Sequence, residues 1–211
     1  MAGVLALAPP ATAQPVPRKQ ARAVRVPADA IRVDGRLDED AWRQIRPLTD
    51  FVQKEPVEGA PPTDRMEVFL AYDEDALLVG ARMWSRPGSI QAPVTRRDDV
   101  SQAEHLWIAL DTYLDRRTAY GFGVTASGVR LDHFHPIDNE YEMDATFDPV
   151  WEAAAHRLED GWSCELRIPY SQLRFNAAPE QVWGLNIDRW IPSRFEDVFW
   201  VPVPKKVTAW A

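Results

Sequence analysis

Glu104–His135 (EHLWIALDTYLDRRTAYGFGVTASGVRLDHFH) is the most informative stretch of the sequence, because it is patterned as three consecutive β-strands. Apolar side chains alternate with others over 106–110, the period of two that a half-buried strand shows. After a polar connection the alternation returns over 120–124, and again over 129–133 beyond a turn of small residues at 126–128. The stretch therefore predicts three strands with one side in a core.

Length and composition describe one globular domain of ordinary size. The 211 residues are 45% hydrophobic, too apolar for a disordered chain. A net charge of −8 argues against a nucleic-acid partner, because a phosphate backbone selects a basic patch. Eighteen prolines and nine tryptophans favour a loop-rich β-protein with aromatic surface. Cys164 is the only cysteine, and its apolar neighbours predict a buried thiol and no intrachain disulfide.

Both ends of the chain carry signals of their own. The start, MAGVLALAPPATAQPVP, resembles the latter half of a secretory signal peptide, although a flexible Ala/Pro-rich leader is the alternative. We therefore divide the chain into a leader over 1–21 and one domain over 22–211. The protein is expected to be secreted, periplasmic or associated with the outer membrane. The strand-like pattern just before the last residues predicts that the chain is the front part of a longer protein.

The remaining segments add further short strands. One hairpin is expected over 66–83 and another over 151–169. Asp38 fits the N-cap of one short helix that ends before Pro47. About nine or ten strands, with turns about every 8–12 residues and one or two short helices, are typical of an all-β antiparallel β-sandwich.

Tryptophans on the side of a strand opposite the core are candidate ligand contacts. By strand parity Trp84, Trp107 and Trp190 point away from the core, and Trp210 lies in a terminal loop. Sugars are the natural ligands, because their C–H faces stack on indole while their hydroxyls bond polar groups at the rim. The alternative is that loops cover these rings. The other tryptophans fit core or anchor positions: Trp42, Trp151, Trp162, Trp183 and Trp200.

Two groups of residues could bind a metal ion. Asp111, Asp132 and Asp144 offer carboxylate oxygens of the kind that Ca²⁺ prefers, although a solvated acidic loop is the alternative. His133 and His135 lie two residues apart on one side of a strand, a spacing that suits zinc or copper if a carboxylate is near.

The sequence contains no recognisable catalytic motif. There is no Gly-x-Ser-x-Gly stretch, and the abundant carboxylates give no acid–base pair by spacing. Gly121 and Gly123 sit inside a strand pattern and do not open a helix, so they form no nucleotide-binding loop. The pattern favours a binding module over an enzyme.

Five segments over about residues 31–210 resemble, in order and spacing, the family 9 carbohydrate-binding modules. They are IRVDGRLDEDAW, RMEVFLAYDEDALLVGARMW, LWIALDTYLDRRTAYGFGVTASGVRLD, DGWSCELRIPYSQLRF and WGLNIDRW. The chain resembles still more closely the related domains at the front of large bacterial envelope proteins of unassigned function. The resemblance implies an antiparallel β-sandwich, often attached to glycoside hydrolases such as xylanases. The closer relatives continue into a long region that resembles a β-barrel.

The resemblance also implies a site. Family 9 modules that bind sugars hold the end of a glycan between two tryptophans, with help from polar side chains, and bind structural calcium. Where the first tryptophan is expected, residues 96–102 contain none. Trp107 stands where a ligand-contacting glutamate is expected, and Gly123 stands near an expected arginine. Only Trp210 matches, in the place of the second tryptophan.

These observations predict a carbohydrate-binding domain of a secreted or cell-envelope protein, linked to polysaccharide catabolism. Its partner would be a poly- or oligosaccharide, contacted by Trp210, Trp107, Trp84 and Trp190. One alternative is an accessory or docking domain, without sugar affinity, of an outer-membrane β-barrel protein. Another is a part of a glycoside hydrolase whose O-glycosyl hydrolase activity lies in an attached domain. The domain by itself is expected to be no enzyme.

Overall fold

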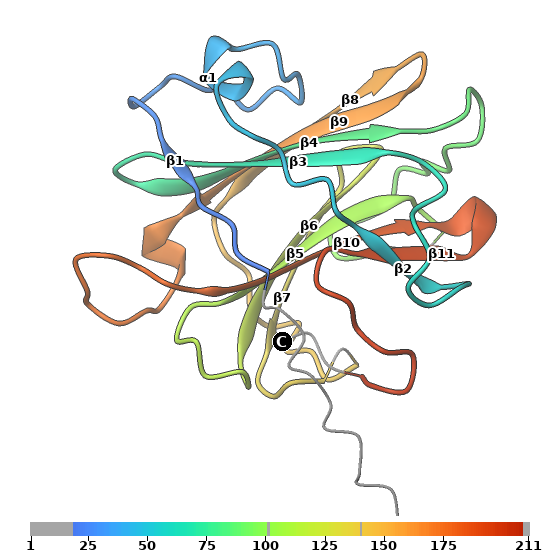
Figure 1. Cartoon of the computed structure of the whole chain (residues 1–211). Coiled ribbons are helices and arrows are strands. Elements are labelled where there is room, and N and C mark those ends of the chain that lie inside the picture. The colour runs from blue at the N-terminus through green and yellow to red at the C-terminus, as the bar shows by residue number, and fades with distance from the viewer. Residues whose placement is uncertain (1–18, 101, 140, 209–211) are drawn as a thin grey trace, which may run out of the picture.

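Two β-sheets face each other in the computed structural model, which describes residues 19–100, 102–139 and 141–208 (Figure 1). The five-stranded sheet has the order β1-β3-β4-β9-β8, and the six-stranded sheet has the order β2-β11-β10-β5-β6-β7. Neighbouring strands are antiparallel except β1 and β3. The predicted antiparallel β-sandwich is confirmed.

The bounds of the strands in the described residues are β1 (Val24–Arg25), β2 (Val52–Glu55), β3 (Met66–Tyr72), β4 (Ala76–Trp84), β5 (His105–Asp111), β6 (Ala119–Thr125), β7 (Arg130–His135), β8 (Glu152–Leu158), β9 (Gly161–Pro169), β10 (Gly184–Ile191) and β11 (Glu196–Phe199). Helical structure is limited to α1 (Asp40–Arg43) and the 3₁₀ turns η1 (Tyr170–Gln172) and η2 (Pro192–Arg194). Both expected hairpins, β3–β4 and β8–β9, are present.

The stretch Glu104–His135 forms β5, β6 and β7 side by side. The register places Leu106 opposite Val124. Ile108 lies opposite Phe122, and all four side chains are buried between the sheets. The turn before β7 uses Gly128 at a φ of +84°, which glycine adopts at no steric cost. The three predicted strands are confirmed.

The alternating set of β7 faces outward. Because Asp132 lies opposite Phe122, Leu131 and His133 point to the outer side of the sheet. Leu131 is nevertheless buried there, and the inner positions hold Asp132 and Phe134. The alternation located this strand, but it could not say which side faces the core, because both sides carry buried residues.

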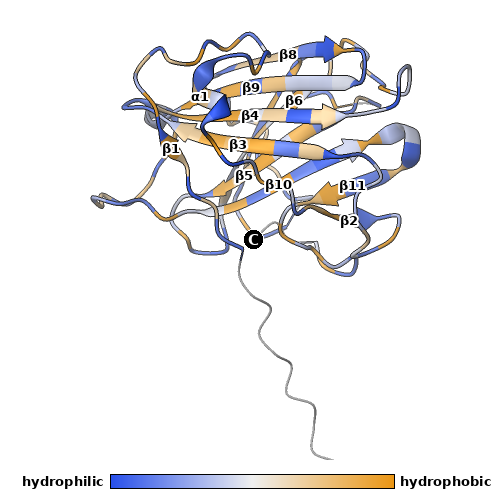
Figure 2. Ribbon diagram, turned by 45° about the horizontal axis from the view of Figure 1, so that its top comes forward, coloured by the Kyte–Doolittle hydropathy of each residue, from blue (hydrophilic) through white to orange (hydrophobic). Residues whose placement is uncertain are grey.

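The main core fills the space between the sheets, and apolar residues are concentrated in the strands that enclose it, such as β3 and β4 (Figure 2). Trp151, Trp162 and Trp200 are buried in this core, as the sequence predicted. Trp183 packs against it and is partly buried. Cys164 is fully buried, and this burial raises the pKa of its thiol. It therefore acts as a small apolar side chain.

A smaller apolar cluster covers the outer side of the five-stranded sheet, under α1. Trp42 packs onto Gly80, where a Cβ atom would come within 3.2 Å of the indole. Glu165 holds the segment in place, because its carboxylate accepts hydrogen bonds from Trp42 Nε1 (2.8 Å) and from the backbone N–H groups of Asp34 and Gly35 (both 2.9 Å). The buried members are Val26, Ile31, Trp42, Ile45, Ala71 and Leu78.

The helix in this cluster differs from the sequence expectation. Its N-cap is Glu39, one residue after Asp38, and the Glu39 side chain makes no capping hydrogen bond. A helix of four residues is held by packing and not by capping, because isolated short helices are unstable. Trp42 provides that packing, which is why the cap chemistry misplaced the boundary.

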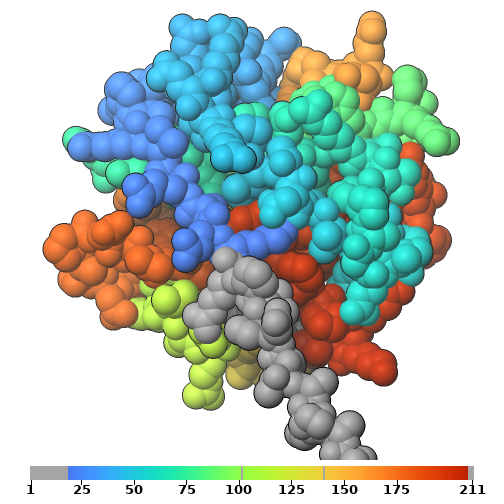
Figure 3. All heavy atoms as spheres, viewed as in Figure 1, coloured from blue at the N-terminus to red at the C-terminus, as the bar shows by residue number. Residues whose placement is uncertain are grey.

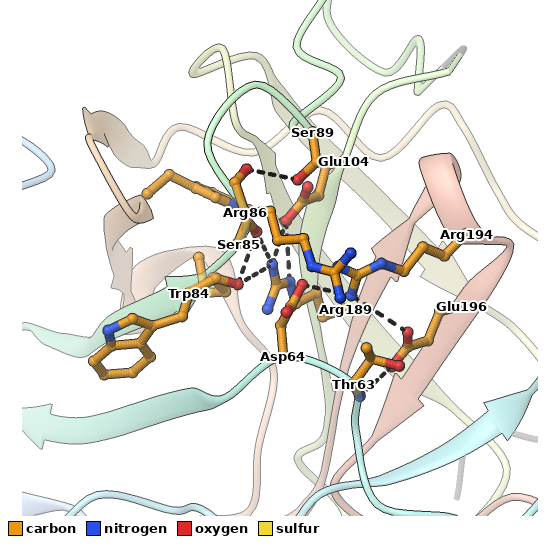
Figure 4. A network of polar contacts seen from close by, with 12 residues as sticks. Thr63, Asp64, Trp84, Ser85, Arg86, Ser89, Glu104, Arg189, Arg194 and Glu196 are labelled. Atoms are coloured by element: carbon orange, nitrogen blue, oxygen red, sulfur yellow. Dashed lines mark hydrogen bonds and ion pairs between the residues drawn. The ribbon is translucent and has the colours of Figure 1, made fainter.

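A buried ion pair joins the two sheets at one end of the sandwich (Figure 4). Arg189 Nη2 on β10 donates to Glu104 Oε1 at 2.6 Å, and both side chains are 1% exposed. The same nitrogen reaches the carbonyl of Trp84 (2.9 Å) and Ser85 Oγ (2.6 Å) at the end of β4. Trp162 Nε1 on β9 completes the bridge by donating to Glu104 at 2.8 Å.

The predicted leader over 1–21 lies, apart from 19–21, outside the described residues. None of the helices in the described ranges is long and apolar enough to cross a membrane.

Candidate functional site

The outer side of the six-stranded sheet carries two of the predicted ligand contacts. Strand register places Trp107 of β5, His133 of β7 and Trp190 of β10 on this side, away from the core. We call this surface the Trp107 face. Its described members include Lys54, Trp107, Gly121, Gly123, His133, His135, Asn186, Asp188, Trp190 and Phe199.

The Trp107 indole lies across β6, in the space left by two glycines. A Cβ atom at Gly121 would lie 2.5 Å from Cζ2 of the indole. At Gly123 it would lie 2.8 Å from Cζ3 and nearer still to Cε3, at the other edge of the ring system. The ring is therefore in direct contact with the β6 backbone. Only 4% of Trp107 is exposed, so it is part of the body of the sheet and not a free platform.

A histidine pair borders this ring. His133 stacks on Trp107, with 4.2 Å between ring centroids and 24° between planes. Its Nε2 lies 2.8 Å from Nε2 of His135, so one nitrogen donates and the other accepts. Burial, with a smaller contribution from His135, lowers the pKa of His133 to about 3, and the ring is neutral at pH 7. In this arrangement the two imidazoles bond each other through the nitrogens that a shared metal would need.

Accessible aromatic surface occurs at one end of the face. Trp190 is partly buried and meets Phe195 edge to face, with 6.1 Å between ring centroids and 80° between planes. Phe195 is 72% exposed and follows η2 with a φ of +50°, a conformation that costs an aromatic residue energy. An exposed ring in a strained turn, beside a partly exposed indole on β10, is the kind of surface that stacks on a ligand.

Polar groups lie within the same surface. Asp188 is opposite Trp107 in the register and is 5% exposed. Lys54 Nζ lies 5.3 Å from the centroid of the Phe199 ring, within cation–π range. Asn186 Oδ1 accepts a hydrogen bond from the backbone of Val201 at 2.9 Å. The face therefore combines indole, imidazole, carboxylate, ammonium and amide groups, but the Asp188, Lys54 and Asn186 side chains are buried.

Trp84 does not belong to this site. It ends β4 in the other sheet, and it is partly buried. The guanidinium carbons of Arg65 and Arg82 lie 4.6 Å and 4.5 Å from its ring centroid. These arginines also pair with Glu67 and Asp160, so the ring is packed among charged side chains. Trp210, the fourth predicted contact, lies outside the described residues.

The three aspartates predicted to bind calcium have other partners. Asp111 accepts from the backbone N–H of Arg116 at 2.7 Å and so closes the β5–β6 turn. Asp144 accepts from Thr146 N and Oγ1 at 2.9 Å and 2.7 Å, which lowers its pKa. In the described ranges no group of three or more His, Cys, Asp or Glu side chains is placed to hold a metal ion. These aspartates do not fit one shared calcium site.

Asp132, the third of them, is buried beside a cation that the protein supplies. Arg97 Nη2 donates to its Oδ1 at 2.6 Å, and Trp151 Nε1 donates to the same oxygen at 2.8 Å. Burial nevertheless raises the pKa of Asp132 above its ordinary value, because it outweighs these two donors. The Arg97 guanidinium is therefore the cation beside Oδ1 of this carboxylate.

Sequence reasoning missed Phe195 and Asp188 as members of the site region. Asp188 lies two residues before Trp190, so the same parity argument could have placed it on the face. Phe195 could not have been found by parity, because its exposure depends on the η2 turn and its positive φ.

The fold belongs to a class whose solved members include sugar-binding modules. A family 9 carbohydrate-binding module from Caldicellulosiruptor kristjanssonii in complex with cellotriose matches with a TM-score of 0.58 and 16% identity, over 84% of this chain and 83% of that one. Its complex with glucose matches with the same TM-score and identity, over 84% of each chain. A candidate carbohydrate-binding protein from Bacteroides uniformis matches with a TM-score of 0.63 and 11% identity, over 86% of this chain and 88% of that one.

The chain therefore has the fold of family 9 carbohydrate-binding modules, as the sequence segments implied. At these identities the likeness establishes the fold. No family model matches the chain, and no curated protein sequence matches it.

Proposed function

We propose that this domain binds carbohydrate. The observation that carries the proposal is the shared fold with modules solved in complex with cellotriose and glucose. The Trp107 face supports it, because it combines aromatic rings with polar side chains, the two kinds of group that sugars require. An oligosaccharide with glucose units is the first ligand to test.

The contact is proposed at the Trp190 end of the face. Trp107 is too deeply buried to offer its ring, whereas Phe195 is exposed and Trp190 is partly exposed beside it. A sugar ring stacked there would lie near the polar groups at the centre of the face, because Trp190 and Asp188 lie on the same side of β10. Trp210 remains a proposed contact on the strength of the family resemblance.

Isothermal titration calorimetry with cellotriose and glucose tests this proposal. We expect saturable binding, with a loss of about tenfold in affinity for Trp190→Ala, the equivalent of 1.4 kcal/mol. The matched control is Trp84→Ala, which removes an indole that two guanidinium groups cover and should leave affinity unchanged. Circular dichroism of each variant separates lost binding from lost folding. Equal losses in both variants would count against the site.

A domain without sugar affinity is the second candidate, and Trp107 is the observation that favours it. The indole fills the place where sugar-binding relatives are expected to carry polar contacts, with Gly121 and Gly123 making room for it. A docking or accessory role in a larger envelope protein would then explain a retained fold with an altered face. Absence of binding to glucans and xylans, with folding intact, would favour this reading.

The remaining expectations rest on the sequence. We propose that the domain is secreted, periplasmic or associated with the outer membrane, which fractionation of cells that express the whole protein can test. A link to polysaccharide catabolism, through an attached glycoside hydrolase, is proposed in the same way. Calcium binding stays a prediction, and melting curves with calcium or with a chelator test it.

A further inference from the structure

Edge strands of a β-sheet have unpaired backbone N–H and C=O groups. In the described part of this protein, loop segments cover or bond most of these edges. The edge of β7 is covered by two loop segments. Asp98 donates its backbone N–H to Arg130 O (3.1 Å) and accepts from Asp132 N through its side chain (2.8 Å). Further along, Phe134 and Asp144 exchange two backbone hydrogen bonds of 3.2 Å and 2.7 Å.

The edges at β2 and β1 also have little capacity to pair with another strand. The loop after β2 folds back on it, because Gln53 N donates to Ala60 O at 2.8 Å and Gly59 N donates to Gln53 O at 2.9 Å. Strand β1 is only two residues long and is therefore too short to pair with much. Among the strands of the described residues, the remaining edge is β8, which is seven residues long.

The backbone pattern shows which groups of β8 point outward. Trp84 donates its N–H towards β3, so the opposite residue, Gly161, turns its own groups towards β8. Every second residue of β8 therefore bonds β9, and the others, Ala153, Ala155 and Arg157, direct N–H and C=O away from the sheet. In the described part of the chain these outward groups have no hydrogen-bond partner.

The composition of β8 leaves this edge open to pairing. EAAAHRL contains no proline and no bulge, the usual means of blocking an edge. Ala153–Ala155 present the smallest side chains a strand commonly has. Two segments contact Ala155: a Cβ at Gly128 would lie 3.9 Å from its nitrogen, and a Cβ at Gly35 would lie 2.7 Å from its carbonyl carbon. Neither glycine forms a backbone hydrogen bond with the outward groups of Ala155.

We propose that β8 pairs antiparallel with β8 of a second copy of this chain. Its charges favour this partner, because Glu152 begins the strand and His156 and Arg157 end it. Antiparallel pairing joins unlike ends, whereas parallel pairing joins like ends. In an antiparallel pair, two residues that lie directly opposite each other direct their backbone groups in the same sense, either both towards the partner strand or both away from it. The two-fold axis must therefore relate one residue to the same residue of the other copy, and it cannot lie midway between two successive residues. An axis at Ala154 places each Glu152 directly opposite His156 of the other copy.

The resulting dimer is weak and depends on concentration. Two strands joined edge to edge bury far less than the roughly 1,200 Å² of a stable interface, so the backbone hydrogen bonds and the two Glu–His pairs provide the affinity. The two five-stranded sheets become one continuous sheet, and the Trp107 face of each copy stays clear, because it belongs to the other sheet. Dimerisation and sugar binding are therefore separable.

Sedimentation equilibrium of the whole chain at pH 6, from about 10 µM to about 1 mM, tests this pairing. We expect the mean mass to rise towards that of a dimer. Ala155→Pro should keep the chain monomeric, because it removes an outward N–H that the domain does not use. Glu152→Lys should weaken association about fivefold. The swap Glu152→Lys/His156→Glu should restore it, since the ion pairs return with reversed signs.

Glu74→Lys is the control, because it makes the same charge change at an exposed site on the β3–β4 turn. It should associate like the unaltered chain. A monomer at every concentration would overturn the proposal. So would a dimer that Ala155→Pro and Glu152→Lys leave intact, because that dimer would use another surface. Failure of Ala155→Pro to fold would leave the charge swap as the deciding comparison.

Discussion

Trp107 and Gly123 lie directly opposite each other in β5 and β6, and the indole occupies the space that a side chain at Gly123 would fill. Each residue therefore depends on the other. Gly121, two pair positions further along β6, makes room for the other edge of the same indole. The result is an outer face that is filled at its centre, with accessible aromatic surface at the Trp190 end.

Gly123→Ala should destabilise the domain by about 1–3 kcal/mol, the usual cost of overpacking. The added Cβ would lie 2.8 Å or less from the indole and 3.0 Å from the Leu106 carbonyl, so the ring has to move. Urea unfolding measures the change. The double variant Gly123→Ala/Trp107→Leu should lose less than the sum of the single variants, because the smaller side chain leaves room. Strict additivity would show that the two residues are independent.

Arg189→Met should destabilise the domain by about 3–5 kcal/mol, because it leaves the Glu104 carboxylate buried without its cation. Thermal or urea unfolding measures this loss. Arg189→Met/Glu104→Gln should recover much of it, since the amide oxygen still accepts from Trp162 and no charge remains buried.

The control for this pair is Arg25→Met, which breaks the exposed ion pair to Glu74. Exposed pairs contribute at most about 1 kcal/mol, so the loss should be small. An Arg189→Met variant as stable as Arg25→Met would contradict the role given to the buried pair.

The free energy of unfolding should fall as the pH rises from about 4.5 to about 7, because of the titration of the Glu165 carboxyl. Burial raises the pKa of this carboxyl from 4.5 to about 7, although three N–H donors act in the opposite direction. The folded state therefore holds a proton that the unfolded chain has lost, and the stabilisation present below pH 4.5 disappears as the pH passes 7.

The contribution of Glu165 over this range is at most about 3 kcal/mol, from the size of the pKa shift. Chemical unfolding between pH 4.5 and pH 7.5 measures it as a difference from Glu165→Gln, which has no proton to lose. Parallel pH profiles for the two proteins would show that Glu165 titrates in the same way folded and unfolded.

The fold could be predicted from the sequence because strand alternation and turn chemistry act locally. Leu106 and Ile108 mark β5 by period, and the turn at Gly128 follows from residue type. The side of β7 that faces the core could not be predicted, since Leu131 is buried on the outer side and Asp132 on the inner side. Burial there depends on segments that pack from elsewhere in the chain.

The candidate site was only partly predictable. Parity placed Trp107 and Trp190 away from the core, but it could not show that glycines on β6 admit the Trp107 ring into the sheet. Parity also could not distinguish Trp84 from Trp107 and Trp190. All three point away from the core, but Trp84 belongs to the other sheet. The position of the Trp107 ring and the sheet to which Trp84 belongs both depend on which strands pair. Alternation within one strand contains no information about that pairing.

The most direct measurement is titration of the ¹⁵N-labelled chain with cellotriose, followed by the indole N–H resonances in NMR spectra. We predict saturable shifts of the Trp190 indole resonance and of backbone amides around Phe195, with little change at Trp84. Spectra that stay unchanged at millimolar sugar, from a chain that is demonstrably folded, would contradict carbohydrate binding at this face.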